Sequence, residues 1–194
     1  MAYLSELQLS EMQFKALGEN VKVSDKAAIY DPHLIEIGDN SRIDDFCLIS
    51  GVVYIGKNCH ITPMCLVAGG SVGVSLADYC TLAYGVKVFA QSDDYSGETM
   101  VNSLIPKKYK NELFAKVTLS KHVVVGANSV ILPGVDLAEG CSVGASSLVT
   151  KSTAPWGVYV GTPAKRIKQR STNLLKLVDM FENDSTFSNK KNTS

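Results

Sequence analysis

The chain has 194 residues, of which 45% are hydrophobic, and its 19 basic side chains balance 19 acidic ones. This length suits one domain, and the balance of charge excludes a strong electrostatic footprint for nucleic acid or an anionic membrane. No apolar run is long enough to span a bilayer and no signal-peptide layout opens the chain, so we expect a cytoplasmic protein whose partners are small molecules or copies of itself.

Residues 1–22 are predicted to form an N-terminal helical cap. The segment 7–17 has the pattern of a short helix, with Ser10 as its N-cap and Gly18 as its stop signal. A helix at this place would cover the open end of the structure that follows it.

Residues 23–153 carry a six-residue repeat. An aliphatic residue recurs every six positions over long stretches, a period that fits neither an amphipathic helix nor an alternating strand. The repeated positions hold Val23, Ile29, Ile37, Ile43, Ile49, Ile55, Ile61, Val67, Leu76, Leu82, Val88, Leu119, Val125, Ile131, Leu137, Val143 and Val149.

The fourth residue after each of these aliphatics is compact, His33 excepted, as expected where a side chain points into a narrow interior beside a turn. Every cysteine of the chain belongs to this class. The cysteines are odd in number and form no CxxC pair, so we expect reduced packing thiols rather than a disulfide framework or a zinc site.

The repeat predicts an all-β fold. Three short strands joined by tight turns make one triangular coil of roughly eighteen residues, and stacked parallel coils rise about 4.8 Å each. We expect a parallel β-helix of about six coils, on the order of 30 Å long. Glycines such as Gly38 and Gly56 suit its corners, where a Cβ atom would crowd the backbone.

Two segments lie outside the repeat. Residues 94–116 form a loop insertion between two coils, and loops of this length inside compact folds are often functional. Residues 154–183 hold a basic stretch and then a helix near 172–182 with apolar side chains on one face. Residues 184–194 are polar and are predicted to form a disordered tail.

The motifs VVVGANSVILPGVDLAEGCSVGASSLVTKS and VGTPAKRIKQR, with the long loop before them, resemble the hexapeptide-repeat acyltransferases, and within these the galactoside, maltose and xenobiotic acetyltransferase branch. The resemblance covers nearly the whole chain. It implies a left-handed β-helix, acetyl-CoA as acyl donor without a metal, and a homotrimer with active sites between subunits. The segments RIDDFCLISG, NCHITPMCLVAGG and AQSDDYSGE are similar to acetyltransferases of surface-polysaccharide (O-antigen) gene clusters, some of which acetylate amino groups on nucleotide-linked deoxysugars.

The resemblance also implies where CoA binds. In that family the pantetheine arm lies along the outside of the prism, against small residues of two consecutive coils, and basic residues after the last coil meet the phosphates. On charge alone the basic stretch would be a solvated face, but its place within GTPAK favours phosphate contact. The matching residues are Gly126, Ala127, Gly144, Ala145, Thr150, Lys151, Pro163, Lys165 and Lys168.

Asp93 stands where the galactoside-type enzymes have their catalytic histidine, at the last residue of the hexad before the loop. The aromatic residue common on the following coil is replaced by Val124. Acyl transfer from a thioester passes through a tetrahedral oxyanion, and an amine must be unprotonated to attack. We therefore expect Asp93 to hold the acceptor amine, and the resemblance of AQSDDYSGE implies acceptor contacts from Ser92, Asp94 and Tyr95.

His60 is the main candidate for a catalytic base. The register stacks it on Arg42 of the coil below, which also carries Asp44 and Asp45, so a carboxylate is available to orient its ring. By the same resemblance we also expect Arg42, Asp44 and Asp45 to contact the substrate. The alternative is a solvated corner histidine. Because His60 and Asp93 lie on different corners of one prism, they cooperate only if a trimer brings together corners of neighbouring subunits.

The other two histidines are expected to have no catalytic role. His33 falls at an inward position of the repeat, and His122 is predicted to be an exposed turn residue. A zinc-dependent carbonic anhydrase would need three converging histidines, which the hexad positions do not provide. A non-catalytic scaffold would not bind CoA.

The sequence thus predicts an N-acetyltransferase acting on a nucleotide-linked amino-deoxysugar, such as a dTDP-4-amino-4,6-dideoxyhexose. The rival is an O-acetyltransferase acting on a sugar hydroxyl, for which losing the usual histidine is more damaging because a hydroxyl is a poor nucleophile without a base. Three points stay open: the identity of the sugar, the position acylated, and whether His60, Asp93 or the departing CoA thiolate takes the proton.

Overall fold

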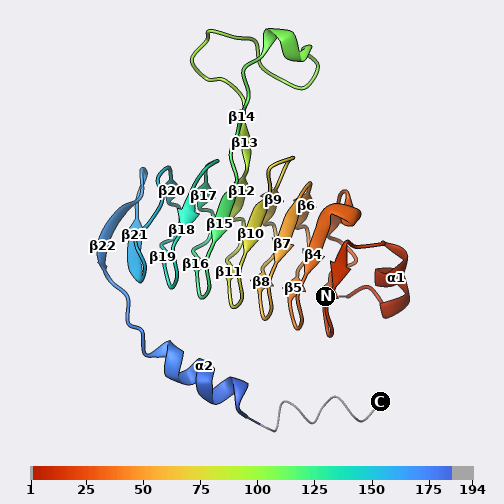
Figure 1. Cartoon of the computed structure of the whole chain (residues 1–194), viewed down its shortest axis with the longest axis vertical. Coiled ribbons are helices and arrows are strands. Elements are labelled where there is room, and N and C mark those ends of the chain that lie inside the picture. The colour runs from red at the N-terminus through yellow and green to blue at the C-terminus, as the bar shows by residue number, and fades with distance from the viewer. Residues whose placement is uncertain (1, 185–194) are drawn as a thin grey trace.

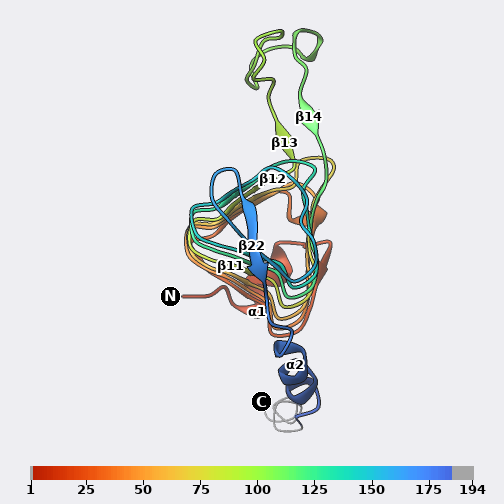
Figure 2. The same cartoon turned by 90° about the vertical axis from the view of Figure 1, so that its left-hand side faces the viewer.

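The computed structural model describes residues 2–184, and these form a β-solenoid of about seven coils with three parallel sheets. The coils stack side by side from the N-terminal end to the C-terminal end (Figure 1), and the view along the stack shows their triangular outline (Figure 2). The expected class of fold is confirmed, with about one coil more than the repeat predicted.

Each side of the triangle is one sheet. The first sheet contains β1 (Ala16–Leu17), β4 (Ile35–Ile37), β7 (Val53–Ile55), β10 (Val74–Leu76), β15 (Val117–Leu119) and β18 (Asp136–Leu137). The second contains β2 (Lys22–Val23), β5 (Arg42–Ile43), β8 (His60–Ile61), β11 (Thr81–Leu82), β16 (Val124–Val125), β19 (Ser142–Val143), β21 (Gly157–Val160) and β22 (Lys165–Gln169). The third contains β3 (Ala28–Ile29), β6 (Leu48–Ser50), β9 (Leu66–Ala68), β12 (Lys87–Phe89), β17 (Val130–Ile131) and β20 (Leu148–Val149).

The strands pair in register from coil to coil, so equivalent hexad positions form columns. On the second sheet Arg42 pairs with His60, and His60 pairs with Thr81. The repeated aliphatic residues form the inner columns, and Ile61 and Leu82 are fully buried. Because parallel strands buried on one face lock their register through such columns, the repeat fixes which residues stack outside.

The five cysteines are free and buried, as the repeat predicted. They lie in the interior columns among the aliphatic side chains, where a thiol packs as a small apolar group. Some residues at the same class of position do not point inward, among them His33 and Ser71. His33 is exposed because a 3₁₀ helix, Pro32–Leu34, interrupts the repeat, and Ser71 is exposed beside the glycines that widen the next corner.

The N-terminal helix is shorter than predicted and begins earlier. Helix α1 spans Glu6–Glu11, and Ser5 rather than Ser10 caps it through a capping box with Gln8. Ser10 lies inside the helix, where its hydroxyl donates to the carbonyl of Leu7. Leu9 is buried against the core, so α1 does cover the first coils as expected.

The C-terminal helix α2 spans Leu174–Glu182, two residues shorter at its start than predicted, and lies alongside the stack of coils (Figure 1). Tyr79 donates a hydrogen bond of 2.6 Å to the carboxylate of Glu182. Burial and this carboxylate raise the pKa of Tyr79 to about 12. The predicted disordered tail falls, Asp184 apart, outside the described residues.

The buried columns predict where the fold is sensitive to mutation. Leu82 is fully buried on β11, so Leu82→Ala should lower the free energy of unfolding by about 2–5 kcal/mol, since it removes apolar contacts and leaves a cavity. The matched control is Leu7→Ala on α1, where the side chain is 68% exposed and the change should stay within about 0.5 kcal/mol. Denaturant unfolding compares the two, and equal losses would contradict the assignment of the core.

Candidate functional site

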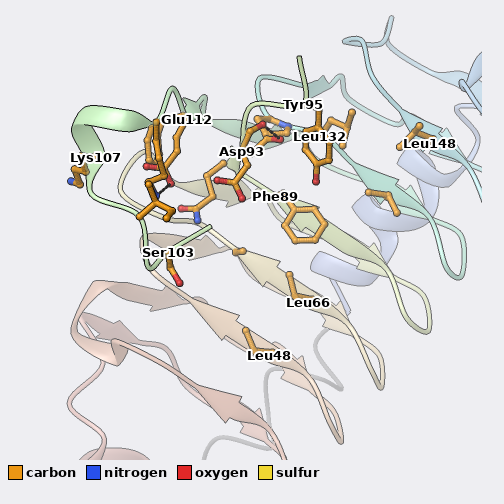
Figure 3. A pocket seen from close by; sticks show the side chains of 18 residues that line it. Leu48, Leu66, Phe89, Asp93, Tyr95, Ser103, Lys107, Glu112, Leu132 and Leu148 are labelled. Carbon is orange, nitrogen blue, oxygen red and sulfur yellow. Dashed lines mark hydrogen bonds and ion pairs between the residues drawn. The ribbon is translucent and has the colours of Figure 1, made fainter. Parts of the chain in front are cut away.

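A hollow lies over the third sheet, at the base of the inserted loop. We call this hollow of about 910 Å³ the loop cavity (Figure 3). Its floor is apolar and its upper wall comes from the loop. It is lined by Leu48, Leu66, Ala68, Phe89, Gln91, Ser92, Asp93, Tyr95, Ser103, Ile105, Lys107, Lys110, Glu112, Phe114, Val130, Leu132, Pro133 and Leu148.

A short antiparallel ribbon fixes the base of the loop. Strands β13 (Gln91–Ser92) and β14 (Leu113–Phe114) pair there, and the loop extends from them away from the coils (Figures 1 and 2). Lys110 forms an ion pair of 3.1 Å with Glu112, and only 6% of the lysine side chain is exposed. This pair and the ribbon hold the loop wall in place.

The structure brings three of the predicted acceptor-binding residues into the loop cavity, namely Ser92, Asp93 and Tyr95. The carboxylate of Asp93 is half-buried and has no hydrogen bond or ion pair within residues 2–184. The other acidic side chain that lines the cavity, Glu112, is paired with Lys110. Asp93 has no such basic partner in the described residues. Such a carboxylate is available to a cationic or hydrogen-bonding ligand.

Asp94 instead organises the loop. Its Oδ1 accepts from the backbone N–H of Ser96 at 2.8 Å and its Oδ2 from the hydroxyl of Thr99 at 2.8 Å. These hydrogen bonds lower the pKa of Asp94 to about 2. Because the folded pKa is depressed, this carboxylate's contribution to loop order is present above its unfolded pKa and is lost as the pH falls from about 4 toward 2.

A second group of chemical side chains lies on the second sheet. Arg42 forms an ion pair with Asp44, with 3.0 Å between Nε and Oδ1, and its Nη2 donates a hydrogen bond of 3.2 Å to Oδ2. His60 Nε2 lies 2.8 Å from Asp44 Oδ2 and 2.7 Å from Arg42 Nη2. The side chain of Asp44 is only 2% exposed, whereas 36% of the His60 side chain is exposed. Arg42 thus stacks on His60 as expected, and Asp44 supplies the carboxylate that contacts the ring.

These contacts determine which ring nitrogen of His60 can react. Asp44 and Arg42 both contact Nε2, and Nδ1 makes no hydrogen bond to any residue in 2–184. A carboxylate that accepts from one ring nitrogen holds the other unprotonated in the neutral ring. Arg42 can only donate to Nε2, from Nε at 3.1 Å, and Asp44 can only accept from it. Nδ1 is the atom that can accept a proton when the neutral ring carries its proton on Nε2 and donates it to Asp44. Tyr3 donates a further hydrogen bond of 3.3 Å to Asp44 Oδ1, a contact that the repeat could not predict.

Asp45 is turned away from this group. Its carboxylate accepts from the hydroxyl of Ser24 and lies 3.7 Å from Lys26 Nζ. These contacts lower the pKa of Asp45 through the hydrogen bond and, less strongly, the neighbouring charge. Asp45 thus joins the first two coils, and Asp44 orients Arg42 and His60.

The His60 group and the loop cavity lie on different sheets of the same chain. Arg42, Asp44 and His60 do not line the cavity. The structure therefore keeps His60 and Asp93 in separate places within one subunit, as the register predicted.

The expected CoA-binding residues lie at the C-terminal end of the solenoid. Gly126 and Gly144 follow strands β16 and β19, which pair directly, so Ala127 and Ala145 also fall on neighbouring coils. A Cβ atom on Gly126 would lie 2.5 Å from the backbone nitrogen of Ala145, so close packing of the coils already requires this glycine.

The polar members of this set are exposed. Thr150, Lys151 and Pro163 lie on the surface, as do Lys165 and Lys168 on β22. Strand β22 turns back along β21 and places Lys165 opposite Val160 and Lys168 opposite Val158. These lysines form no ion pair within residues 2–184. They are free to meet an anionic ligand.

His122 and Arg170 have structural contacts instead. Only 8% of His122 is exposed, which corrects the expectation of an exposed residue. Its ring stacks on Tyr79 with 5.2 Å between ring centroids and lies 6.3 Å from the ring of Trp156. Burial lowers the pKa of His122. Arg170 donates to the carbonyl oxygens of His122 and Gly140 and so anchors the chain after β22.

Residues 2–184 have neither a metal-binding cluster nor a membrane-spanning helix. Residues 2–184 contain no group of three or more histidine, cysteine, aspartate or glutamate side chains arranged to hold a metal ion. None of the helices in that range combines the length and apolarity that crossing a bilayer requires.

The fold and the site together define the class: a hexapeptide-repeat acyltransferase. A dTDP-4-amino-4,6-dideoxy-D-glucose acyltransferase from Escherichia coli is 42% identical over 185 residues, which cover 94% of this chain and 96% of that protein. At this identity and coverage the chain belongs to the family of dTDP-4-amino-4,6-dideoxy-D-glucose acyltransferases. No protein-family model matches the chain.

Solved structures agree with this assignment. AntD, an N-acyltransferase from Bacillus cereus, superimposes with a TM-score of 0.93 at 41% identity, covering 94% of this chain and 98% of AntD. AntD has been solved with dTDP and 3-hydroxybutyryl-CoA, and single-residue mutants of it with dTDP and coenzyme A and with dTDP-4-amino-4,6-dideoxyglucose and coenzyme A. A shorter match joins the chain to a chloramphenicol acetyltransferase from Klebsiella aerogenes, 36% identical over 55 residues, 28% of this chain and 26% of that one.

Proposed function

We propose that this protein transfers an acyl group from acyl-CoA to the 4-amino group of dTDP-4-amino-4,6-dideoxyglucose. The observation that carries the proposal is the unpaired carboxylate of Asp93 in the loop cavity. An amino sugar is a cation at neutral pH, and a half-buried carboxylate binds and orients a cation that enters the cavity. The substrates of the E. coli relative and of AntD support this choice.

In the proposed reaction the ammonium held by Asp93 first loses a proton to solvent, and the resulting unprotonated amine attacks the thioester carbonyl. The nitrogen–carbon bond forms, the tetrahedral intermediate collapses, and the carbon–sulfur bond breaks to release CoA. The attacking nitrogen loses one proton during this sequence. His60 Nδ1 takes that proton in this proposal, with the ring in the tautomer that donates from Nε2 to Asp44. Asp44 and Arg42 orient the ring, and their expected contact with the substrate stays a prediction.

We propose that the site is completed by a second copy of the chain. His60 and Asp93 lie on different sheets, so a shared site needs one residue from each of two neighbours. A homotrimer with three equivalent interfaces supplies this arrangement. A mass near 63 kDa, three times the chain's 20.9 kDa, is expected from light scattering, whereas a monomer at micromolar concentration would contradict the shared site.

The acyl group is proposed to be acetyl, as the resemblance to the acetyltransferase branch implies. AntD binds 3-hydroxybutyryl-CoA, so a longer group is the direct competitor. Comparing kcat/KM for acetyl-CoA and 3-hydroxybutyryl-CoA, at one acceptor concentration, decides between them. A higher value for 3-hydroxybutyryl-CoA would reject acetyl as the natural group and leave acyl transfer intact.

The acceptor experiment tests the function itself. Release of the CoA thiol is followed with dTDP-4-amino-4,6-dideoxyglucose and, in parallel, with the dTDP-sugar that carries a hydroxyl at C4. We expect thiol release only with the amine and an amide in the product. Release with the hydroxy sugar alone would favour the alternative, O-acylation. A role in the cytoplasm, in making a surface polysaccharide such as O-antigen, would follow from an acylated nucleotide sugar.

The lysines after the last coil are proposed to meet the CoA phosphates. Lys151→Ala, Lys165→Ala and Lys168→Ala should each raise KM for acetyl-CoA about 3- to 10-fold with little change in kcat, since a surface charge contributes to binding and not to the chemical step. The effect should shrink as salt is added. Lys57→Ala serves as the control, because that lysine pairs with Asp39 near the other end of the solenoid. Unchanged KM in all three variants would contradict the assignment.

A further inference from the structure

A second, smaller cavity adjoins the loop cavity. It has a volume of about 390 Å³, and we call it the corner cavity. Two residues, Ala68 and Gln91, line both cavities, so the two hollows meet at this pair. The rest of the corner cavity is lined by Asp31, Leu34, Ser50, Gly51, Gly70 and Ser71.

The backbone of Gln91 is held firmly between the loop and the coils. On one side β13 pairs with β14, opposite Phe114. On the other side the N–H of the preceding Ala90 donates to the carbonyl of Ala68 at 2.9 Å. Gln91 therefore does not move freely with the tip of the loop.

Gln91 and Asp93 face the same hollow. They are two residues apart along an extended strand end, where alternate side chains share a face, and both line the loop cavity. The primary amide of Gln91 makes no hydrogen bond to any residue in 2–184, and the residue is exposed. Two donors and one acceptor are thus presented next to the free carboxylate.

Gly70 makes room for this side chain. A Cβ atom on Gly70 would lie 2.7 Å from Oε1 of Gln91, and Gly70 has a φ of +53°, a conformation that favours glycine. Any larger residue would push the amide out of the junction between the two cavities. The absence of a side chain at Gly70 therefore determines whether the Gln91 amide can lie at this junction.

The chemistry of the acceptor indicates what such an amide would bind. In a 4-amino-4,6-dideoxy sugar the carbon on one side of the amine carries a hydroxyl, at C3, and the carbon on the other side carries the methyl group. A neutral amide forms hydrogen bonds to a hydroxyl, both as donor and as acceptor. We propose, resting on the function above, that Gln91 binds the C3 hydroxyl of the acceptor while Asp93 holds the neighbouring amine.

The test pairs a protein change with a substrate change. Gln91→Ala should raise KM for dTDP-4-amino-4,6-dideoxyglucose about 3- to 10-fold, the loss expected for one hydrogen bond to a neutral group, with KM for acetyl-CoA unchanged. The 3-deoxy analogue should show the same loss with the wild-type enzyme. In Gln91→Ala the 3-deoxy analogue should have the same KM as the full sugar, because the hydrogen bond that the analogue lacks has already been removed.

Gly70→Ala provides a second variant that leaves the amide in the chain but displaces it. It should reproduce the rise in acceptor KM and the insensitivity to the 3-deoxy analogue. Ser71→Ala is the matched control, since this exposed serine lines the corner cavity but not the loop cavity, and its kinetics should equal those of the wild type with both sugars. Thermal melting of each variant verifies that the fold is kept.

Additive losses would overturn the proposal: if the 3-deoxy analogue is penalised equally in the wild type and in Gln91→Ala, the amide does not bind that hydroxyl. An unchanged acceptor KM in Gln91→Ala would overturn it as well. Failure of the proposed function is a different result, because the wild-type enzyme would then release no CoA with the amino sugar.

Discussion

His60→Asn is expected to lower kcat by about two to four orders of magnitude, with little change in KM for either substrate. The reason lies in the contacts of the ring. Asp44 and Arg42 contact Nε2 and fix its orientation, and Nδ1 has no partner in the described chain. Asparagine keeps a polar side chain of smaller size but has no group that accepts a proton at neutral pH.

The control is the same substitution at His33, which is exposed on a 3₁₀ turn and does not line the loop cavity. His33→Asn should leave kcat unchanged. A His60→Asn enzyme that stays within about tenfold of the wild type would remove His60 from the mechanism. The departing CoA thiolate would then be the proton acceptor, and the pH dependence of kcat would follow the substrate ammonium alone.

Asp93→Asn is expected to raise KM for the amino sugar about 10- to 100-fold and to leave KM for acetyl-CoA unchanged. The substitution preserves the shape of the side chain and removes its charge, and hydrogen bonds to charged groups contribute more to binding than neutral ones. In the wild type, acceptor affinity should weaken as the pH rises through the pKa of the substrate amine. In Asp93→Asn that dependence should be nearly absent.

Asp136→Asn is the matched control, because this exposed aspartate lies on β18 of the first sheet, away from the loop cavity. Steady-state kinetics across pH, with saturating acetyl-CoA and varied acceptor, compares the two variants. An Asp93→Asn enzyme with normal acceptor KM and the wild-type pH dependence would show that the carboxylate does not bind the amine.

The fold was predictable because the hexapeptide repeat acts on every coil. Each repeated aliphatic residue fills the interior, and its period sets the triangular outline and the stacking of Arg42 with His60. Exceptions arose where contacts depend on residues distant in sequence. His122 was expected on the surface, but Tyr79 and Trp156 cover its ring from neighbouring coils. His33 left the interior because Pro32 begins a 3₁₀ helix there.

The candidate site was predictable in part for the same reason. The columns of the repeat bring Asp44 to His60, and the hexad before the loop presents Asp93. Gln91 could not be found this way, because its importance comes from two cavities that exist only once the loop folds back over the third sheet. The consecutive glycines Gly69 and Gly70 are the feature of the sequence that could have pointed to this place, since glycine beside a regular repeat indicates a close approach of other atoms.

The central claim is that His60 of one subunit and Asp93 of its neighbour form one active site, and a mixed trimer tests it most directly. His60→Asn and Asp93→Ala chains, each nearly inactive at limiting acceptor, are co-expressed with different affinity tags, and the mixed trimers are purified through both tags. If the site is shared, each mixed trimer regains both residues at one of its three interfaces, so the purified mixed trimers should have about a third of the wild-type activity. Activity no higher than that of the separate variants would contradict the account, since both residues would then have to come from the same chain.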